Sequence, residues 1–287
     1  MQPRLITRVI GGAYGLIVAA YLVLPALAVV PIAFSSGEFL QFPPKGFSTR
    51  WVVAFFSDPQ WMEALTRSIV IALLTAVIAV PIGTVAAYAM VRGHRGAQLA
   101  AEPILMLPLL IPVVISGFAL YLMTLVLRFQ GGLFLVLLGH VGLSIPFVVT
   151  VVLAAMRTFD MRLLQAARVS GANAVQAFLK VLVPVIAPAI GAAALIAIMT
   201  SLDEAVIALF LIGDTAPTLP VKMFSSITYA LNPLVPVAAT VLTLATIMLL
   251  VLSLLLMQLN RRRAHVDMGL GPSTTPPDTS TGQGPHP

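Results

Sequence analysis

Long runs of apolar residues without any charge dominate the chain. Five such runs are uninterrupted, and they cover about residues 10–34, 68–91, 103–127, 129–156 and 223–260. The fourth supplies a predicted span at about 132–156, and the fifth one at about 235–259. A sixth run, at about 184–212, carries Asp203 and Glu204 in its distal half. Since a bilayer core of about 30 Å needs roughly 20 helical residues, the pattern predicts six membrane-spanning helices.

Helices, not strands, are the predicted elements of these runs. The runs lack strict in/out alternation and are more than twice as long as a membrane strand. Hydrophobic residues make up 59% of the chain and charged residues only 9%, so too little polar surface exists to cover a water-soluble particle. The predicted fold class is therefore an all-α polytopic membrane protein.

The two ends of the chain have different compositions. The N-terminal apolar run is too long for the hydrophobic region of a cleaved signal, so it is predicted to be a retained span. Residues 264–287 are rich in Pro, Gly, Ser and Thr, which predicts a disordered tail after a membrane domain at 1–263. The chain contains no cysteine, which excludes disulfides and thiol chemistry.

The basic residues predict the orientation in the membrane. Six spans put both termini on one side, whose segments contain Arg4, Arg8, Arg92, Arg95, Arg157, Arg162, Arg168, Lys180 and Arg261 to Arg263. The opposite segments contain Lys45, Arg50, Arg67, Arg128 and Lys222. Because Lys and Arg accumulate on the cytoplasmic side, both termini are predicted to be cytoplasmic. The net charge of +6 is spread between spans, so it does not indicate nucleic-acid binding.

The predicted outer loop at 35–67 is rich in aromatic residues and also contains Pro43 and Pro44. Such a segment is typical of chain that lies along the membrane interface, where Trp is favoured. Two interpretations stay open: an anchoring belt, or a docking surface for an external partner.

A polar segment at 157–183 separates the fourth and fifth predicted spans and is too long for a simple hairpin. Its first half, 161–169, predicts a helix that ends at Ser170 and Gly171. Its second half, 173–182, predicts a helix with Asn173 as N-cap. That helix has Val175, Phe178, Leu179 and Leu182 on one face. From periodicity alone, this helix pair could rest on lipid headgroups or lie in a groove of another protein.

The same segment contains a spaced motif: Gln165-Ala166-Ala167, three residues, Gly171, nine residues, and Val181-Leu182-Val183-Pro184. It resembles the EAA loop of permease subunits of binding-protein-dependent ABC importers, whose pattern is E-A-A, three residues, G, nine residues, I-x-L-P. All spacings match. Gln165, Val181 and Val183 replace Glu, Ile and Leu, and the first replacement removes a charge but keeps a hydrogen-bond acceptor.

The resemblance extends to about residue 263 and is strongest to permeases of the spermidine/putrescine type. It also rests on FPPKGFSTRW (42–51), HVGLSIPFVV (140–149), RTFD (157–160), SLDE (201–204) and TLPVKMFSSI (218–227). It implies a bacterial inner-membrane protein that works with a second permease, two ATP-binding subunits and an external solute-binding protein. ATP and Mg would be bound by those ATP-binding subunits. Residues 157–183, here named the coupling loop, would contact them together with the residue that follows. The contacts implied are Gln165, Ala166, Ala167 and Gly171 of the loop, and Pro184.

Asp203 and Glu204 are unusual inside an apolar run, because a carboxylate at the centre of a membrane helix costs roughly 2.5 to 3.5 kcal/mol. They could lie near the outer headgroups or pair with a neighbouring helix. Alternatively, they could line a path for a cationic solute. Adjacent helical residues point about 100° apart, so we expect only one, Asp203, to face the path. A secondary transporter driven by an ion gradient through these acids is the alternative function.

No phosphate-binding loop, nucleophile elbow or zinc-protease motif occurs in the sequence, so the chain is predicted to be a transport subunit and not an enzyme. His140 has no His or carboxylate at ligand spacing. It is predicted to hydrogen-bond to a neighbouring helix and not to bind a metal. Pro81, Pro108, Pro112 and Pro146 lie within predicted spans, where they could form hinges or packing kinks.

Overall fold

The computed structural model describes residues 27–38, 41–129, 131–212, 215–229 and 232–267, with scattered positions between 12 and 24. The predicted first span, 10–34, lies partly outside the described residues, and so does most of the predicted tail, 264–287. Within the described ranges the fold is helical, and the extended pairing consists of an isolated bridge between Ser35 and Phe47.

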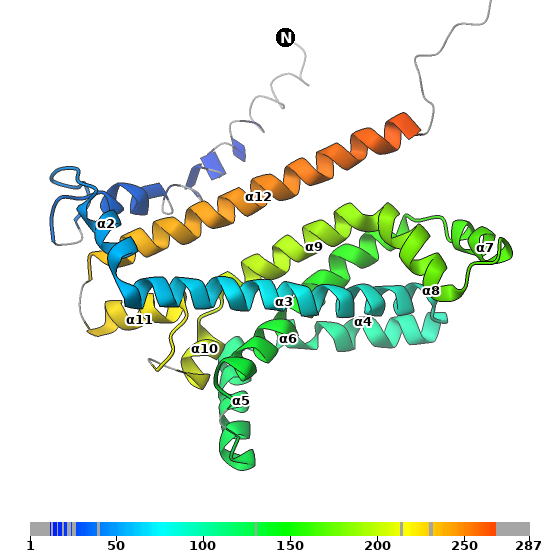
Figure 1. Ribbon diagram of the computed structural model, residues 1–287, viewed down its shortest axis with the longest axis horizontal. Coiled ribbons are helices and arrows are strands. Elements are labelled where there is room, and N and C mark those ends of the chain that lie inside the picture. Colours follow the sequence, from blue (N-terminus) through cyan, green and yellow to red (C-terminus); the bar gives the residue numbers. More distant parts are fainter. Residues whose placement is uncertain are drawn as a thin grey trace, which may run out of the picture.

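The helices follow one another through short loops (Figure 1). In chain order they are α2 (Arg50–Ser57), α3 (Pro59–Arg92), α4 (Arg95–Leu110), α5 (Val113–Leu127), α6 (Gly132–Arg157), α7 (Arg162–Val169), α8 (Ala174–Ala177), a π-helix (Phe178–Leu182), α9 (Val183–Asp203), α10 (Val206–Leu211), α11 (Leu219–Tyr229) and α12 (Leu234–Asp267).

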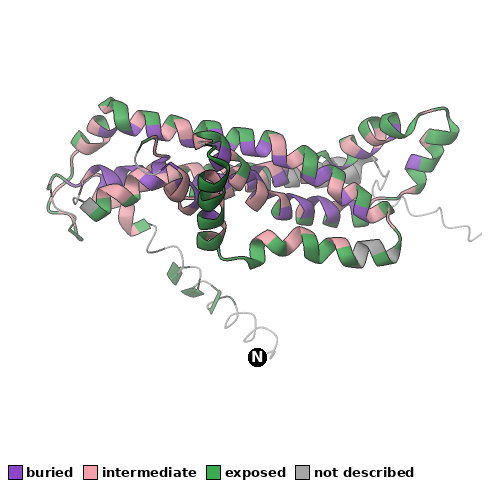
Figure 2. Ribbon diagram, turned by 90° about the horizontal axis from the view of Figure 1, so that it is seen from below, coloured by how far each residue is buried: buried purple, intermediate pink, exposed green. Residues whose placement is uncertain are grey.

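The centre of the molecule is the packing of α3, α6 and α9 against one another. Buried residues follow these helices, whereas α5 is largely exposed (Figure 2). The contact surface is built from small and β-branched residues, such as Ala79 of α3, Val148 of α6 and Ala197 of α9, all fully buried. Small residues let membrane helices approach closely, and this gain in van der Waals contact replaces the hydrophobic driving force that lipid does not supply.

Four helical stretches are long and apolar enough to cross a membrane: Pro59–Arg92, Gly132–Arg157, Ala174–Asp203 and Leu234–Ser253. They correspond to four of the predicted spans. α12 continues past the predicted end of the last span, about residue 259, as far as Asp267. The all-helical membrane fold is therefore confirmed, although the described residues do not contain six separate spans.

The predicted span at about 103–127 is not a single straight helix. This region is divided between α4 and α5, whose axes differ by 87°. Ile111 has an extended backbone (φ −83°, ψ 125°), as expected for a residue that precedes a proline, here Pro112. The bend leaves α5 projecting sideways from the bundle (Figure 1), where it packs mainly on α10.

The run predicted as a span at about 184–212 is also divided. α9 ends at Asp203, and Glu204 has extended dihedrals (φ −80°, ψ 113°). The carboxylate of Glu204 accepts a hydrogen bond of 2.8 Å from the backbone N–H of Ile207. Because the first N–H groups of a helix lack partners within the helix, this contact favours the start of a new helix, α10.

The aromatic-rich segment at 35–67 does not simply lie on an interface. Phe55 and Trp61 are buried in a cluster with residues of α11 and α12, whereas Phe42 and Phe47 are exposed. The loop therefore contributes a second core at the end of the bundle that carries α2 and α11, here named the α11 end.

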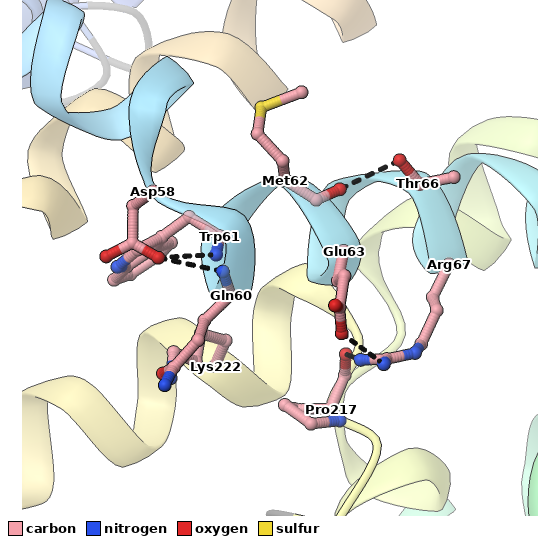
Figure 3. Close-up of polar contacts among 9 residues, drawn as sticks. All are labelled: Asp58, Gln60, Trp61, Met62, Glu63, Thr66, Arg67, Pro217 and Lys222. Carbon is pink, nitrogen blue, oxygen red and sulfur yellow. Dashed lines mark hydrogen bonds and ion pairs between the residues drawn. The ribbon is translucent and has the colours of Figure 1, made fainter.

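Polar contacts join α3 to α11 at this end, as Figure 3 shows. Asp58 caps α3 by accepting a hydrogen bond of 2.8 Å from the N–H of Gln60. The Gln60 side chain accepts a bond of 2.7 Å from the Lys222 ammonium of α11. Arg67 pairs with Glu63 at 2.8 Å. The bond between Lys222 and Gln60 links α11 to the start of α3, whereas the other two contacts lie at or within α3 itself.

Gly83 of α3 allows the close approach of α6, because a Cβ at this position would lie 2.6 Å from Val148 Cγ1. We expect Gly83→Ala to overpack the α3–α6 contact and cost about 1–3 kcal/mol. The measurement is the apparent Tm of the purified protein in detergent, which should fall. Gly142→Ala is the matched control, because a Cβ at 142 meets nothing within 4 Å. Equal Tm values for the two variants would contradict this role of Gly83.

Candidate functional site

The coupling loop begins with α7, which is followed by a tight helix stop. The N–H of Ala172 donates to the carbonyl of Ala167 at 3.0 Å, and that of Gly171 to Arg168 at 3.1 Å. Gly171 has φ +93°, a conformation that L residues other than glycine rarely adopt. The pair of bonds is the Schellman arrangement, so the predicted helix end at Ser170 and Gly171 is confirmed.

Asn173 then starts the second half of the coupling loop, as predicted. Its side chain accepts a hydrogen bond of 2.8 Å from the N–H of Gln176, and the Gln176 side chain accepts one of 3.0 Å from the N–H of Asn173. This reciprocal capping box satisfies two N–H groups that would otherwise lack partners. The direction of the second helix is therefore determined by local contacts.

The second helix does not end at Leu182, where the sequence predicts its end. It runs through the π-helix into α9, so that Ala174–Asp203 forms one helical stretch of 30 residues. Pro184 lies in the first turn of α9 and has no N–H to donate, which interrupts the regular hydrogen-bond pattern beside the π-helix. The coupling loop is thus continuous with a membrane span.

The predicted apolar face of this second helix is divided in the structure. Leu182 is fully buried and Phe178 is partly buried, but Val175 and Leu179 are 65% and 54% exposed. The π-helix changes the angular spacing of successive side chains, so the four residues do not share one environment. One part packs on the bundle, and the other stays uncovered.

The coupling loop rests on the end of α3 and projects beyond it (Figure 1). The rings of Tyr88 and Phe178 pack edge to face, with centroids 4.8 Å apart. Leu164 of α7 is buried, whereas Gln165 and Ala166 are exposed and Ala167 is partly buried. The loop is therefore anchored on one side and open on the other, including at the positions of the EAA-like motif.

The two acids lie at the opposite end of α9 and have different environments. Asp203 is exposed and lines a cavity of about 380 Å³ between α9 and α12, together with Thr200 and Thr246. Glu204 is partly buried, and its carboxylate is engaged at the start of α10. Among the described residues, the Asp203 carboxylate has no hydrogen-bond or ion-pair partner, whereas the Glu204 carboxylate has one.

A buried polar contact near this end joins the three central helices. His140 Nδ1 of α6 lies 2.7 Å from Ser201 Oγ of α9, and Ser201 Oγ lies 3.4 Å from Thr75 Oγ1 of α3. The prediction that His140 bonds to a neighbouring helix is confirmed. Ser201 and Thr75 were not predicted, and the only signal in the sequence is a hydroxyl within an apolar run.

The prolines within predicted spans have different positions in the fold. Pro81 and Pro146 lie inside α3 and α6, which continue through them. Pro108 lies near the end of α4, and Pro112 follows directly at the bend before α5. Of these four prolines, only Pro112 coincides with a change of chain direction, the bend between α4 and α5.

Comparison with known proteins agrees with this geometry. Residues 79–266 match the family model of the binding-protein-dependent transport system inner membrane component. The chain is 34% identical over 230 residues to the putrescine transport system permease protein PotI of Escherichia coli, covering 77% of this chain and 81% of the relative. It is 26% identical over 252 residues to the spermidine/putrescine transport system permease protein PotC of the same organism, covering 88% and 95%.

The fold is also similar to that of a solved transporter. A chain of a bacterial ABC transporter involved in the import of the acidic polysaccharide alginate is 18% identical, with a TM-score of 0.66, over 90% of this chain and 98% of that one. The matched family model includes both the coupling loop and Asp203. This protein therefore belongs to the inner-membrane permease components of binding-protein-dependent ABC importers.

Proposed function

We propose that this permease forms, with a second and similar permease, the path by which a polyamine such as spermidine or putrescine enters the cell. Two ATP-binding subunits drive it, and an external solute-binding protein delivers the solute. The polyamine assignment is supported by the names of the PotI and PotC relatives and by an exposed carboxylate, Asp203, beside a cavity, because polyamines are cations.

The continuity of the coupling loop with α9 is the observation that supports the proposed mechanism. A helical stretch of 30 residues is about 45 Å long at 1.5 Å per residue. A displacement of the coupling loop by the ATP-binding subunits is carried along this stretch to Asp203 at its other end. The path then changes between outward and inward access. ATP and Mg act in the partner subunits, and this chain supplies the moving helix.

The proposed orientation has the coupling loop and both termini in the cytoplasm and the α11 end outside. α12 runs from the α11 end towards the end that carries α7 (Figure 1). The basic residues Arg92, Arg157 and Arg168 lie at the coupling-loop end. This distribution is typical of a cytoplasmic face. The exposed residues Gln165 and Ala166 are then accessible to an ATP-binding subunit.

Reconstituted uptake tests the proposed function. The permease is purified from its native membrane with its companions, placed in proteoliposomes, and supplied with radiolabelled spermidine and the binding protein. Uptake should require ATP on the side of the coupling loop. Uptake without ATP that follows an imposed ion gradient would instead support the ion-gradient alternative, which nothing in the comparisons favours.

Gly171→Val should uncouple transport from ATP hydrolysis. At φ +93° a β-branched residue is strained by about 1–2 kcal/mol or more, so the turn between α7 and α8 is expected to rearrange. Spermidine uptake per ATP hydrolysed in proteoliposomes measures the effect. Gly171→Asn is the control, because Asn tolerates positive φ better than Val, and it should keep most of the coupling. Full coupling in the Val variant would contradict a role for this turn.

Asp203→Asn should raise the KM for spermidine by roughly tenfold or more, as expected when a charge that attracts a cation is removed. Glu204→Gln should leave the KM nearly unchanged, because its amide oxygen can still accept the bond from Ile207. Initial uptake rates at varied spermidine concentration measure both. A KM effect confined to the Glu204 variant, or absent from both, would contradict the assignment of Asp203 to the path.

A further inference from the structure

A small pocket lies where the coupling loop meets the end of α3. Its volume is about 230 Å³, and its lining includes Arg92 of α3 together with Leu164, Gln165 and Arg168 of α7. The volume is several times the roughly 30 Å³ of a water molecule and lies below the 300 Å³ at which drug-sized sites begin. Its size suits one inserted side chain and not a whole solute.

The charged groups of this pocket are all cationic. Arg92 donates a hydrogen bond of 2.9 Å to Tyr88 Oη, and its guanidinium lies 5.5 Å from the centroid of the Tyr88 ring. Among the described residues, the ion pairs of the coupling-loop end are limited to Arg157 with Glu102. Neither Arg92 nor Arg168 has a carboxylate partner there. The pocket therefore contains positive charge that the chain itself does not neutralise.

Gln165 adds to this imbalance. It lies three residues before Arg168 on α7, a spacing that makes the two side chains neighbours. Its amide is neutral and supplies N–H donors, whereas a carboxylate at this position would neutralise the arginine. Arg, Gln and Tyr side chains thus present donors around one pocket. Their natural ligand is an anion that only accepts hydrogen bonds, and a carboxylate matches the planar fork of a guanidinium.

The surroundings indicate which anion this is. Val169, directly after Arg168, is 89% exposed, and Val175 and Leu179 of the same loop are also uncovered. Uncovered apolar residues beside a charged pocket are typical of a protein interface with a specific central contact. We propose that the pocket receives an Asp or Glu side chain of the partner ATP-binding subunit, so that the permease contributes the cations of this ion pair. This inference rests on the proposed function.

Two variants test the pocket in the full complex. Arg168→Glu reverses a charge of the pocket lining. Gln165→Glu adds a negative carboxylate that would pair with the arginines and repel the incoming carboxylate. We expect each to reduce the ATP-binding subunit that co-purifies with the tagged permease by about tenfold or more, as for a broken interfacial charge pair. A Glu or Asp to Arg substitution in the ATP-binding subunit should restore binding to Arg168→Glu.

Matched controls separate the pocket from general charge. Arg162→Glu makes the same charge change on α7 outside the pocket lining, and Gln176→Glu adds a carboxylate compatible with the capping box. Both should change co-purification less than about twofold, within the range of exposed charges. Equal losses in the controls and the pocket variants would overturn the proposal.

Lipid headgroups are the competing source of an anion. The co-purification is repeated in nanodiscs of zwitterionic lipid alone and in nanodiscs that also contain anionic phospholipid. If the pocket variants lose the ATP-binding subunit in both kinds of nanodisc, the result supports the protein carboxylate. A loss confined to anionic nanodiscs assigns the pocket to lipid phosphate and overturns the proposal. If the wild-type permease brings no ATP-binding subunit, the proposed function fails as well. If it does and both pocket variants bind normally, only this inference fails.

Discussion

The packing of α9 against α3 and α6 is the contact on which both functional ends of the molecule depend. Small residues such as Ala193 and Ala197 are fully buried in it, and Ser201 adds a hydrogen bond to His140. In a membrane these close contacts and buried hydrogen bonds are the main attractions between helices. They hold α9 in a defined position. The coupling loop at one end of the helical stretch and Asp203 at the other are therefore held at a fixed relative position.

The coupling loop combines a rigid local structure with apolar residues that the rest of the chain leaves exposed. The Schellman turn at Gly171 and the capping box at Asn173 satisfy the backbone around the corner. In contrast, Val169 and Val175 remain exposed. A rigid element with uncovered apolar residues loses little conformational entropy when a partner covers it. This is the property expected of a surface through which one subunit moves another.

The two ends of α9 also show how one helix can carry different chemistry. At the coupling-loop end the pocket beside α7 is lined by two arginines, Arg92 and Arg168. At the other end an exposed carboxylate, Asp203, faces a cavity shared with α12. Because neither charge lies in the centre of the bundle, the apolar middle of the helix avoids the cost of a buried ion. Glu204 avoids that cost in another way, by capping α10.

The amino-acid sequence by itself determined the helical membrane fold, the position of the coupling loop, its glycine corner and its N-cap, because apolar periodicity and capping are local properties. Only the structure decided the 87° bend after α4, the division of the run at about 184–212 at Glu204, and the splitting of the apolar face around Leu182. It also decided which acid is free and which arginines share a pocket. The bend and the division follow local backbone breaks at Ile111 and Glu204, which hydropathy does not encode. The environments of the acids and of the arginines depend on contacts between residues distant in sequence.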